Sequence, residues 1–277
     1  MNIEFIVWNF SGKVGEIGNF SVNCYGLLFA AGLALAGYWI YNRFIEEGMT
    51  EKDFEMFLIW SFICMFLGCR LCHCLFYQWN YFSNHPLEIF LPFKISSEGW
   101  NFIGYRGLAS HGGAVGMVVA MLIFRAKTHR DLWKVMDIVA IGACLAGAFI
   151  RLGNLMNSEI VGLPTQLPWG FVFTAVDNQP RHPAQLYESL FYIAEFSAAA
   201  LLFNKYRYSS KLRPGAYFGA VVAVMFTFRL LIENVKEVQE SFEKEMMFDM
   251  GQILSVPFIV VGVVIFLLKI LQKKGRK

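Results

Sequence analysis

The sequence has little charge and no long polar segment. Only 16% of its 277 residues are charged, whereas 56% are hydrophobic, and the mean hydropathy is +0.47. A soluble globule needs more polar surface than this composition supplies. No linker, low-complexity tract or convincing internal repeat divides the chain. A single polytopic membrane domain over residues 1–277 is therefore expected.

The sequence also lacks the marks of a removable signal peptide. The N-terminal MNIEFIVWNFSGKVGE has no basic segment, and no small-residue cleavage motif follows the first apolar run. We therefore expect this first run to remain as a membrane span.

Seven apolar segments approach or exceed the roughly 20 residues that cross a bilayer. They are residues 22–41, 54–77, 108–125, 132–152, 183–203, 215–232 and 251–271. The sequence thus predicts an all-α integral membrane protein with about seven transmembrane helices.

Lysine and arginine gather in alternate connections, which predicts the orientation of the chain. The basic connections are residues 125–134 and 205–213, together with the C-terminal tail, whereas the connections between them carry fewer basic residues. This bias predicts an N-terminus outside and a C-terminus in the cytoplasm. The net charge of +3 is then a topology signal, and nucleic-acid binding is not expected because the basic residues form no stripe.

The six cysteines do not form a persuasive metal site. They lie in or beside apolar spans, and three of the residues in CRLCHC, namely Cys69, Cys72 and His73, share one helix face. A tetrahedral site would need further ligands, and no second His or Cys cluster provides them. Cysteine is also an ordinary small packing residue, so no metal is predicted.

Polar residues fall at corresponding depths in successive spans. An ionisable side chain at the bilayer centre costs roughly 3 kcal/mol or more, and the predicted topology brings the polar group of every span to its outer half. The residues concerned are Tyr25, Arg70, His111, Arg151, Asn154, Gln185, Tyr187, Glu188, Arg229, Glu233 and Gln252. This pattern predicts one polar cavity near the outer face, and its arginines favour an anionic head group.

Each of these residues, taken singly, also has a structural explanation. Arg70 and Arg151 fit interfacial anchors, and Arg229 with Glu233 fits an i, i+4 ion pair. A lone His111 fits a hydrogen-bonded packing residue. Their shared depth favours the common site.

The glycines of YRGLASHGGAVG allow two interpretations. Gly112, Gly113 and Gly116 permit either close helix packing or the approach of a ligand to the backbone. Asp137 and Glu195 lie away from the outer cluster, and the sequence assigns them no role.

Six ordered blocks resemble those of the bacterial prolipoprotein diacylglyceryl transferases. They are YGLLFAAG, SHGGAVG, RLGNLMNSEIVG, RHPAQLYES, FRLLIE and MGQILSVP, and together they span nearly the whole chain. The resemblance implies transfer of the diacylglyceryl group of phosphatidylglycerol to the lipobox cysteine thiol of a preprolipoprotein, with release of glycerol phosphate. It also implies a bacterial inner membrane protein whose active site faces the periplasm, without a metal or organic cofactor.

The resemblance also implies roles for individual residues. Arg151 and Arg229 would handle the phosphate, and His111 would be the proposed base. The residues expected in catalysis or substrate binding are Tyr25, Arg70, His111, Gly112, Gly113, Arg151, Asn154, Glu159, Gly162, Gln185, Tyr187, Glu188, Arg229 and Glu233. The chain departs from the family pattern at Leu155 and Ser158, and at Lys236, where the family commonly has Arg.

The implied chemistry leaves two routes to a reactive thiolate open. A free thiol has a pKa near roughly 8.5, so either His111 accepts its proton or the arginines lower its pKa. One competing function is a transporter or channel, which would need polar residues that continue towards the cytoplasm, and Asp137 and Glu195 are the only candidates. Another is an intramembrane protease, but the sequence has neither an H-E-x-x-H helix nor a persuasive pair of nucleophile and base. Residues 78–107 are predicted to form an interfacial arm, and residues 158–182 an external cap.

Overall fold

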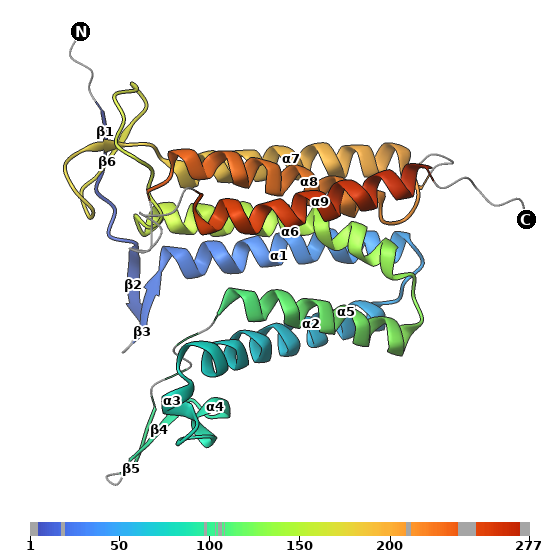
Figure 1. The fold of residues 1–277 in the computed structure, drawn as a ribbon, viewed down its shortest axis with the longest axis horizontal. Coiled ribbons are helices and arrows are strands. Elements are labelled where there is room, and N and C mark those ends of the chain that lie inside the picture. Colours follow the sequence, from blue (N-terminus) through green and yellow to red (C-terminus); the bar gives the residue numbers. More distant parts are fainter. Residues whose placement is uncertain are drawn as a thin grey trace, which may run out of the picture. The chain divides into compact units, whose positions relative to one another are not determined.

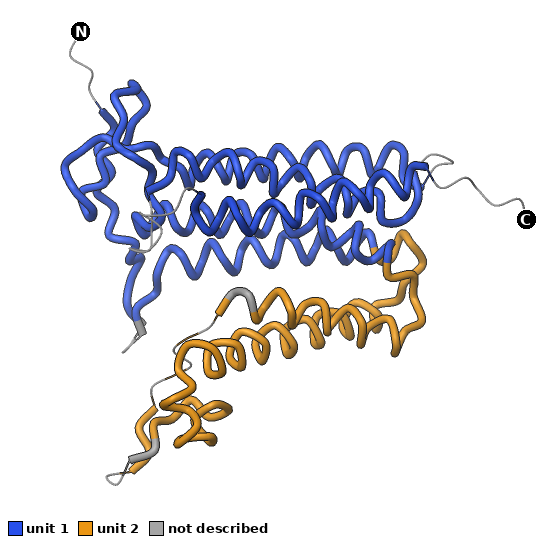
Figure 2. The backbone as a smooth tube through the Cα atoms, viewed as in Figure 1, with its two compact units in different colours: residues 1–43, 133–277 blue, residues 44–132 orange. Residues whose placement is uncertain are grey.

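The computed structural model describes residues 5–17, 20–96, 99–102, 104, 107, 109–208, 212–237 and 248–271. The chain divides into two compact units (Figure 2). Unit 1 comprises residues 1–43 and 133–277, and unit 2 comprises residues 44–132.

Unit 1 is a bundle of long helices with a small sheet at one end (Figure 1). Its helices are α1 (Cys24–Glu46), α6 (Leu132–Met156), α7 (Ala184–Tyr206), α8 (Ala216–Ile232) and α9 (Met250–Leu271), and the short 3-10 helix η2 (Glu233–Val235) extends α8. Glycines let α8 and α9 approach closely: a Cβ on Gly219 would lie 2.6 Å from the backbone nitrogen of Phe266. Such small-residue contacts are typical of membrane helices.

The sheet of unit 1 joins the N-terminal residues to the predicted cap. Strand β6 (Phe171–Phe173) pairs in parallel with β1 (Ile6–Trp8) and antiparallel with β7 (Pro180–Arg181). A separate hairpin of β2 (Lys13–Ile17) and β3 (Phe20–Asn23) leads into α1. The indole of Trp8 donates a hydrogen bond to the carbonyl of Leu155 at 3.1 Å, which attaches β1 to the end of α6.

Unit 2 is a pair of long helices with a small extension. Helices α2 (Glu51–Cys72) and α5 (Ser110–Thr128) lie side by side, and between them come the π-helix η1 (His73–Tyr77), α3 (Trp79–Phe82), α4 (Leu87–Phe90) and a hairpin of β4 (Phe93–Ser96) and β5 (Gly99–Phe102). Thr50 and Asp53 cap the start of α2 reciprocally. Arg130 donates two hydrogen bonds to Asp53. These bonds attach the C-terminal end of unit 2 to the first turn of α2.

The prediction of an all-α integral membrane protein is confirmed. Six helices of the described chain are long and apolar enough to cross a membrane: Cys24–Glu46, Glu51–Tyr77, Leu132–Met156, Ala184–Tyr206, Ala216–Val235 and Met250–Leu271. The remaining predicted span, residues 108–125, corresponds to α5. The two short hairpins and the three-stranded sheet lie outside these helices, and the sequence pattern predicted no strands there. Strand β3 includes residues 22 and 23, which the pattern had assigned to the first span.

Asp137, for which the sequence suggested no role, caps a neighbouring helix. It lies on α6 with no exposed surface. Its two carboxylate oxygens accept hydrogen bonds from the backbone nitrogens of Gly215 and Phe218, at 2.7 and 2.6 Å. These nitrogens belong to the first turn of α8, where backbone donors lack helical partners. These two hydrogen bonds offset the free-energy cost of burying the Asp137 carboxylate.

Candidate active site

Three helix ends meet at the end of unit 1 that carries the sheet. The end of α6, the start of α7 and the end of α8 lie together there (Figure 1), because the chain reverses direction between consecutive helices. Arg151, Glu188 and Arg229 belong to these three ends respectively. A set of charged groups from distant parts of the sequence is thereby assembled.

Arg151 lies between an acid and an amide. Its Nε is 3.2 Å from Oε2 of Glu188, and its Nη1 donates a hydrogen bond to Oδ1 of Asn154 at 3.3 Å. Tyr192 of α7 lies within electrostatic reach of both Arg151 and Arg229. The guanidinium of Arg151 is thus held in place, with 13% of its side chain exposed.

Glu159 is held by amide groups. Asn154 and Asn157 each donate a hydrogen bond to one of its carboxylate oxygens, at 3.2 and 3.1 Å. Gln185 donates to the Glu159 backbone carbonyl. The RLGNLMNSEIVG block thus folds back on itself and packs against the start of α7.

Lys236 is a central residue of the site that was not among the predicted site residues. Its ammonium lies 3.1 Å from Oε1 of Glu188 and 3.1 Å from Oε1 of Glu233, and 4% of its side chain is exposed. In the sequence, Lys236 lies in a connection between two predicted spans, at a position where the family commonly has Arg. That departure was the signal that could have identified it.

Arg229 is the third cation of the site, after Arg151 and Lys236, and it is the most loosely paired of the three. Its Nη2 lies 4.0 Å from Oε1 of Glu233, and 36% of its side chain is exposed. The groups Arg151, Glu188, Lys236, Glu233 and Arg229 are called the ion-pair chain below. A Cβ on Gly251, at the start of α9, would lie 2.5 Å from Oε1 of Glu233, so α9 also borders this chain.

The site contains equal numbers of cations and acids. The ion-pair chain has three cations and two acids, and Glu159 adds a third acid through Asn154. Acids that neutralise arginines also fix their direction. An incoming anion would meet Arg229 most readily, because its pairing distance is longest and its side chain is most exposed.

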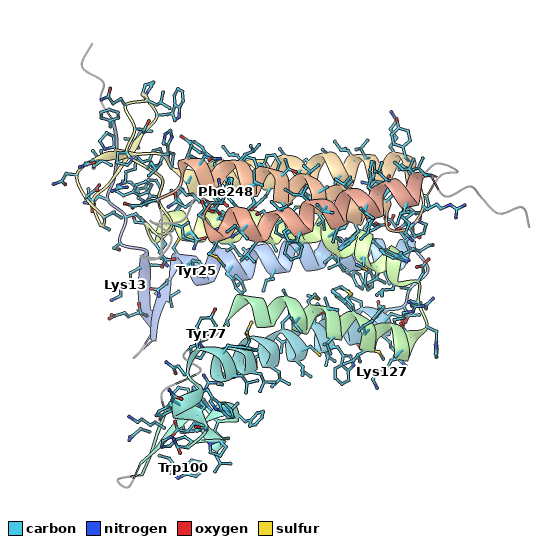
Figure 3. The ribbon with its side chains drawn as sticks, in the orientation of Figure 1. Lys13, Tyr25, Tyr77, Trp100, Lys127 and Phe248 are labelled. Carbon is cyan, nitrogen blue, oxygen red and sulfur yellow. The ribbon has the colours of Figure 1, made fainter. Side chains whose placement is uncertain are left out.

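Tyr25 lies beside the same end of α6. It is the second residue of α1 (Figure 3), and a Cβ on Gly153 would lie 2.7 Å from Cδ2 of its ring. Gly153 precedes Asn154, so the tyrosine packs on the turn that carries the predicted arginine and asparagine. The lack of a side chain at Gly153 makes this approach possible.

The start of α7 also carries a cluster of aromatic and imidazole groups. The indole of Trp169 donates a hydrogen bond to the Tyr187 hydroxyl at 2.9 Å, and this hydroxyl lies 3.3 Å from Nδ1 of His182. Burial lowers the pKa of His182 below its ordinary value. Burial therefore favours the neutral form of this imidazole. His182 was not among the predicted site residues.

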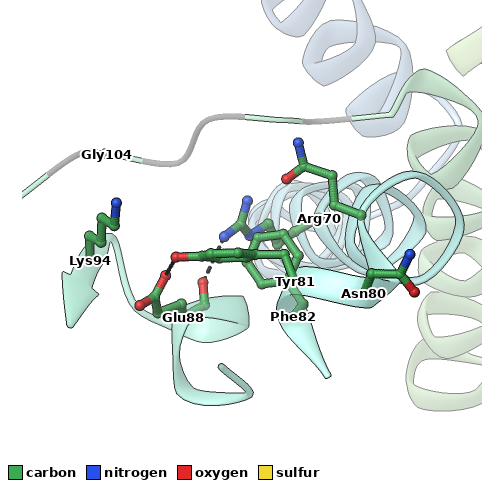
Figure 4. Close-up of a pocket in the computed structure, with 8 residues that line it drawn as sticks. Arg70, Asn80, Tyr81, Phe82, Glu88, Lys94 and Gly104 are labelled. Carbon is green, nitrogen blue, oxygen red and sulfur yellow. Dashed lines mark hydrogen bonds between the residues drawn. The ribbon is translucent and has the colours of Figure 1, made fainter. Parts of the chain in front are cut away.

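Arg70, in unit 2, is bound to the arm segment. Its guanidinium donates hydrogen bonds to the backbone carbonyls of Glu88 and Ile89, at 2.6 and 3.0 Å, and stacks on the Phe82 ring at 4.8 Å. Arg70 also lines a cavity of about 490 Å³ (Figure 4) with Gln78, Asn80, Tyr81, Phe82, Glu88, Lys94 and Gly104. Arg70 was predicted to bind substrate. Its observed contacts hold residues of the arm segment against α2.

Gly112 and Gly113 lie where α5 packs on α2. A Cβ on Gly112 would collide with the Gly68 carbonyl, and one on Gly113 would lie 2.8 Å from Sγ of Cys69. Of the two interpretations of these glycines, the described contacts are those of close helix packing. The backbone of His111 belongs to the first turn of α5, and its side chain lies outside the described residues.

Within the described part of the chain, no group of three or more His, Cys, Asp or Glu side chains is arranged to hold a metal ion. The cysteines of the CRLCHC segment are unpaired thiols. Cys69 faces Gly113 and His73 faces Gly107, so both residues contribute to packing within unit 2.

Comparison with known proteins identifies the family. A sequence model described as prolipoprotein diacylglyceryl transferase matches residues 13–268. The chain belongs to this family. The resemblance inferred from the six blocks is thereby confirmed.

Several relatives named phosphatidylglycerol–prolipoprotein diacylglyceryl transferase match along almost their full length. The protein of Bacteroides fragilis is 41% identical over 259 residues, which cover 93% of each chain. That of Tolumonas auensis is 38% identical over 271 residues, 97% of this chain and 99% of its own. That of Chloroherpeton thalassium is 32% identical over 275 residues, 99% and 98% of the two chains.

Membership of the prolipoprotein diacylglyceryl transferase family makes the chain a transferase with several membrane helices. The matched region covers all of unit 2 and most of unit 1, and it includes the ion-pair chain of unit 1 and the arm segment of unit 2.

Proposed function

We propose that this chain transfers the diacylglyceryl group of phosphatidylglycerol to the lipobox cysteine thiol of a preprolipoprotein, the first step of lipoprotein maturation. A sulfur–carbon bond forms at the glyceryl carbon, and the bond from that carbon to the phosphate ester oxygen breaks. The electron pair leaves with glycerol phosphate, and the thiol proton passes to a base or to the departing phosphate. No metal or organic cofactor is needed for this displacement.

The observation that carries the proposal is the ion-pair chain. Two arginines and a lysine from the ends of α6 and α8 are held by Glu188 and Glu233 within one site. Negative charge grows on the leaving phosphate during the reaction, and prepositioned cations in a site with little water stabilise it strongly. Arg151 and Arg229 take this role because guanidinium groups bind phosphate oxygens in pairs.

The two arginines differ in how they would act. Arg151 is fixed by Glu188 and Asn154, which suits a group that orients the phosphate. Arg229 is loosely paired and more exposed, so it can turn from Glu233 to an incoming phosphate at little cost. Glu233 keeps Lys236 as a partner when this happens.

Neutral groups complete the proposed binding site. Asn154 and Tyr25 supply donors for the lipid head group, and Glu159 orients Asn154 through a 3.2 Å hydrogen bond. Gln185 and Tyr187 lie at the start of α7, close to Glu188, and Gln185 holds the Glu159 backbone in place. Gly162 permits the close approach of the segment that carries Lys236.

Thiol activation follows one of two routes. His111 of α5 accepts the proton, or the cations of the site lower the thiol pKa so that no dedicated base is required. The proposed residues Arg70, Gly112 and Gly113 belong to unit 2, where their described contacts support the arm segment and α5.

We further propose that the protein resides in the bacterial inner membrane with its site towards the periplasm. The excess of Lys and Arg in residues 125–134, residues 205–213 and the tail supports a cytoplasmic position for these segments. The whole chain then forms one polytopic domain, with residues 78–107 as an interfacial arm and residues 158–182 as a periplasmic cap.

Reconstitution tests the reaction directly. Purified protein is incubated in vesicles with phosphatidylglycerol labelled in its acyl chains and a peptide that contains a lipobox cysteine. The expected product is a thioether-linked diacylglyceryl peptide, with one equivalent of glycerol phosphate. A peptide with Ser in place of the lipobox Cys is the matched control, and absence of product with the Cys peptide would overturn the proposal.

A further inference from the structure

Arg181 has a full set of contacts at the junction of the cap segment (residues 158–182) and α7. It ends strand β7 and is 7% exposed. Its Nε and Nη2 face the carboxylate of Asp177, with a shortest distance of 2.6 Å between Nη2 and Oδ2. Arg181 holds the pKa of Asp177 below its ordinary value. This pairing fixes the guanidinium plane.

The remaining edge of the guanidinium faces two other segments. Nη1 donates a hydrogen bond to the backbone carbonyl of Gly162 at 3.1 Å and lies 3.2 Å from Oε2 of Glu237. Gly162 belongs to the cap segment, whereas Glu237 follows α8 by a few residues. One side chain thus connects the cap segment with the segment that follows α8.

Gly162 and Lys236 face each other across a short backbone bridge. Leu163 donates to the Val235 carbonyl at 2.8 Å, and Glu237 donates to the Val161 carbonyl at 3.1 Å. A Cβ on Gly162 would lie 2.7 Å from the carbonyl oxygen of Val235, so this approach requires glycine. The position of the Lys236 backbone therefore depends on the position of Gly162.

We propose that Arg181 is a positioning residue of the transferase, which holds the Gly162–Lys236 bridge so that the Lys236 ammonium lies between Glu188 and Glu233. This role rests on the proposed function, because it assigns Arg181 to the same reaction. Both acids lie 3.1 Å from the ammonium, and a flexible lysine side chain reaches such a place only from a fixed backbone. Arg181 itself binds no substrate.

Cysteine labelling tests the positioning without reference to catalysis. Lys236→Cys introduces a thiol whose reaction with N-ethylmaleimide is followed by mass spectrometry of its own peptide. With Arg181 intact we expect slow labelling, since Lys236 is 6% exposed. Arg181→Gln in the same chain should accelerate it at least about tenfold. Unchanged labelling would overturn the proposal.

Two controls from the same chain separate positioning from general unfolding. Cys144 has no exposed surface and should stay unlabelled in every variant. Arg130→Gln removes a comparable arginine–aspartate pair with Asp53 and should leave labelling at position 236 unchanged. If Arg181→Gln exposes Cys144, Glu237→Gln replaces it as the test, because it removes one partner of the same guanidinium.

Kinetics then connect the position to the reaction. In the otherwise unmodified chain, Arg181→Gln should lower kcat at least about tenfold and change KM for phosphatidylglycerol by less than about threefold. Faster labelling with unchanged kcat would overturn the role of Arg181 in turnover. Should the unmodified protein form no thioether product, the proposed function fails, while the labelling result still decides whether Arg181 positions residue 236.

Discussion

The ammonium of Lys236 lies 3.1 Å from Oε1 of Glu188, a carboxylate with no exposed surface. Glu188 also lies 3.2 Å from Arg151, so one buried acid joins cations from two helix ends. A buried carboxylate is stable as an anion only with such partners. Glu188 is therefore the link through which α6, α7 and the end of α8 share one electrostatic site.

Removal of the lysine charge should destabilise the protein and slow the reaction. Lys236→Met leaves Glu188 with one cation, and breaking a buried ion pair costs about 3–5 kcal/mol. We expect a lower midpoint of thermal unfolding in detergent and at least a tenfold loss of turnover. Lys236→Arg should keep most of both. Lys127→Met, on α5, is the control, and equal midpoints for the two Met variants would contradict this prediction.

Removal of either arginine that we propose to bind the phosphate should strongly slow transfer without preventing insertion. Arg151→Ala and Arg229→Ala each delete a cation of the ion-pair chain, and loss of one charge-stabilising donor costs roughly 10²–10³ in rate. Turnover is measured with labelled phosphatidylglycerol, and insertion by membrane fractionation. Arg125→Ala, at an exposed arginine of α5, should retain full activity. Normal turnover in either site variant would refute the phosphate role.

His111→Gln distinguishes the two routes to the thiolate. If His111 accepts the thiol proton, the variant should lose at least about 10²-fold in rate. If the cations activate the thiol, the variant should retain activity, with a flattened dependence of rate on pH. The measurement is the pH profile of kcat for both proteins between pH 5.5 and about 9, a range that includes the ordinary thiol pKa of roughly 8.5.

His182 should make stability depend on pH. Burial lowers its pKa below 6.5, so the unfolded chain binds a proton more readily than the folded one as the pH falls below 6.5. Stability should then decrease with falling pH through this window. Asp177, whose pKa Arg181 lowers from 3.8, stays ionised there. Thermal unfolding from about pH 7.5 to 5.5 should show a smaller decrease for His182→Gln, and parallel curves would contradict the assignment.

Sequence patterns predicted the parts of the site that lie on helices. The C-terminal ends of predicted spans four and six carried Arg151 and Arg229, and the start of predicted span five carried Glu188. Helical periodicity and the cost of charge in a membrane locate such residues without knowledge of the fold. The Arg151–Asn154 hydrogen bond follows from the i, i+3 spacing of the two residues.

The residues that the sequence did not reveal lie in connections. Lys236 and Arg181 lie in connections between the predicted spans, where a basic residue is normally exposed. Their burial depends on the bridge between Gly162 and Lys236, a backbone pairing between segments far apart in the chain. Hydrophobic periodicity carries no information on such a pairing. The only signal in the sequence was the Lys at position 236, where the family commonly has Arg.

Arg70 illustrates the converse difficulty. Its depth in span two resembled that of the other arginines, yet its guanidinium binds the carbonyls of Glu88 and Ile89. Depth in a span does not tell whether a cation faces a ligand or the backbone of its own connection.

The parallel pairing of β1 with β6 has a consequence for biogenesis. Trp8 and the Leu155 carbonyl that it contacts are 147 positions apart, and the partner strand of β1 is made later still. At about 5–20 residues per second, a ribosome needs on the order of 10–30 s between the two. Throughout that interval the nascent N-terminal strand has an unsatisfied edge, so chaperone capture and mispairing compete with assembly while the later helices are still being synthesised.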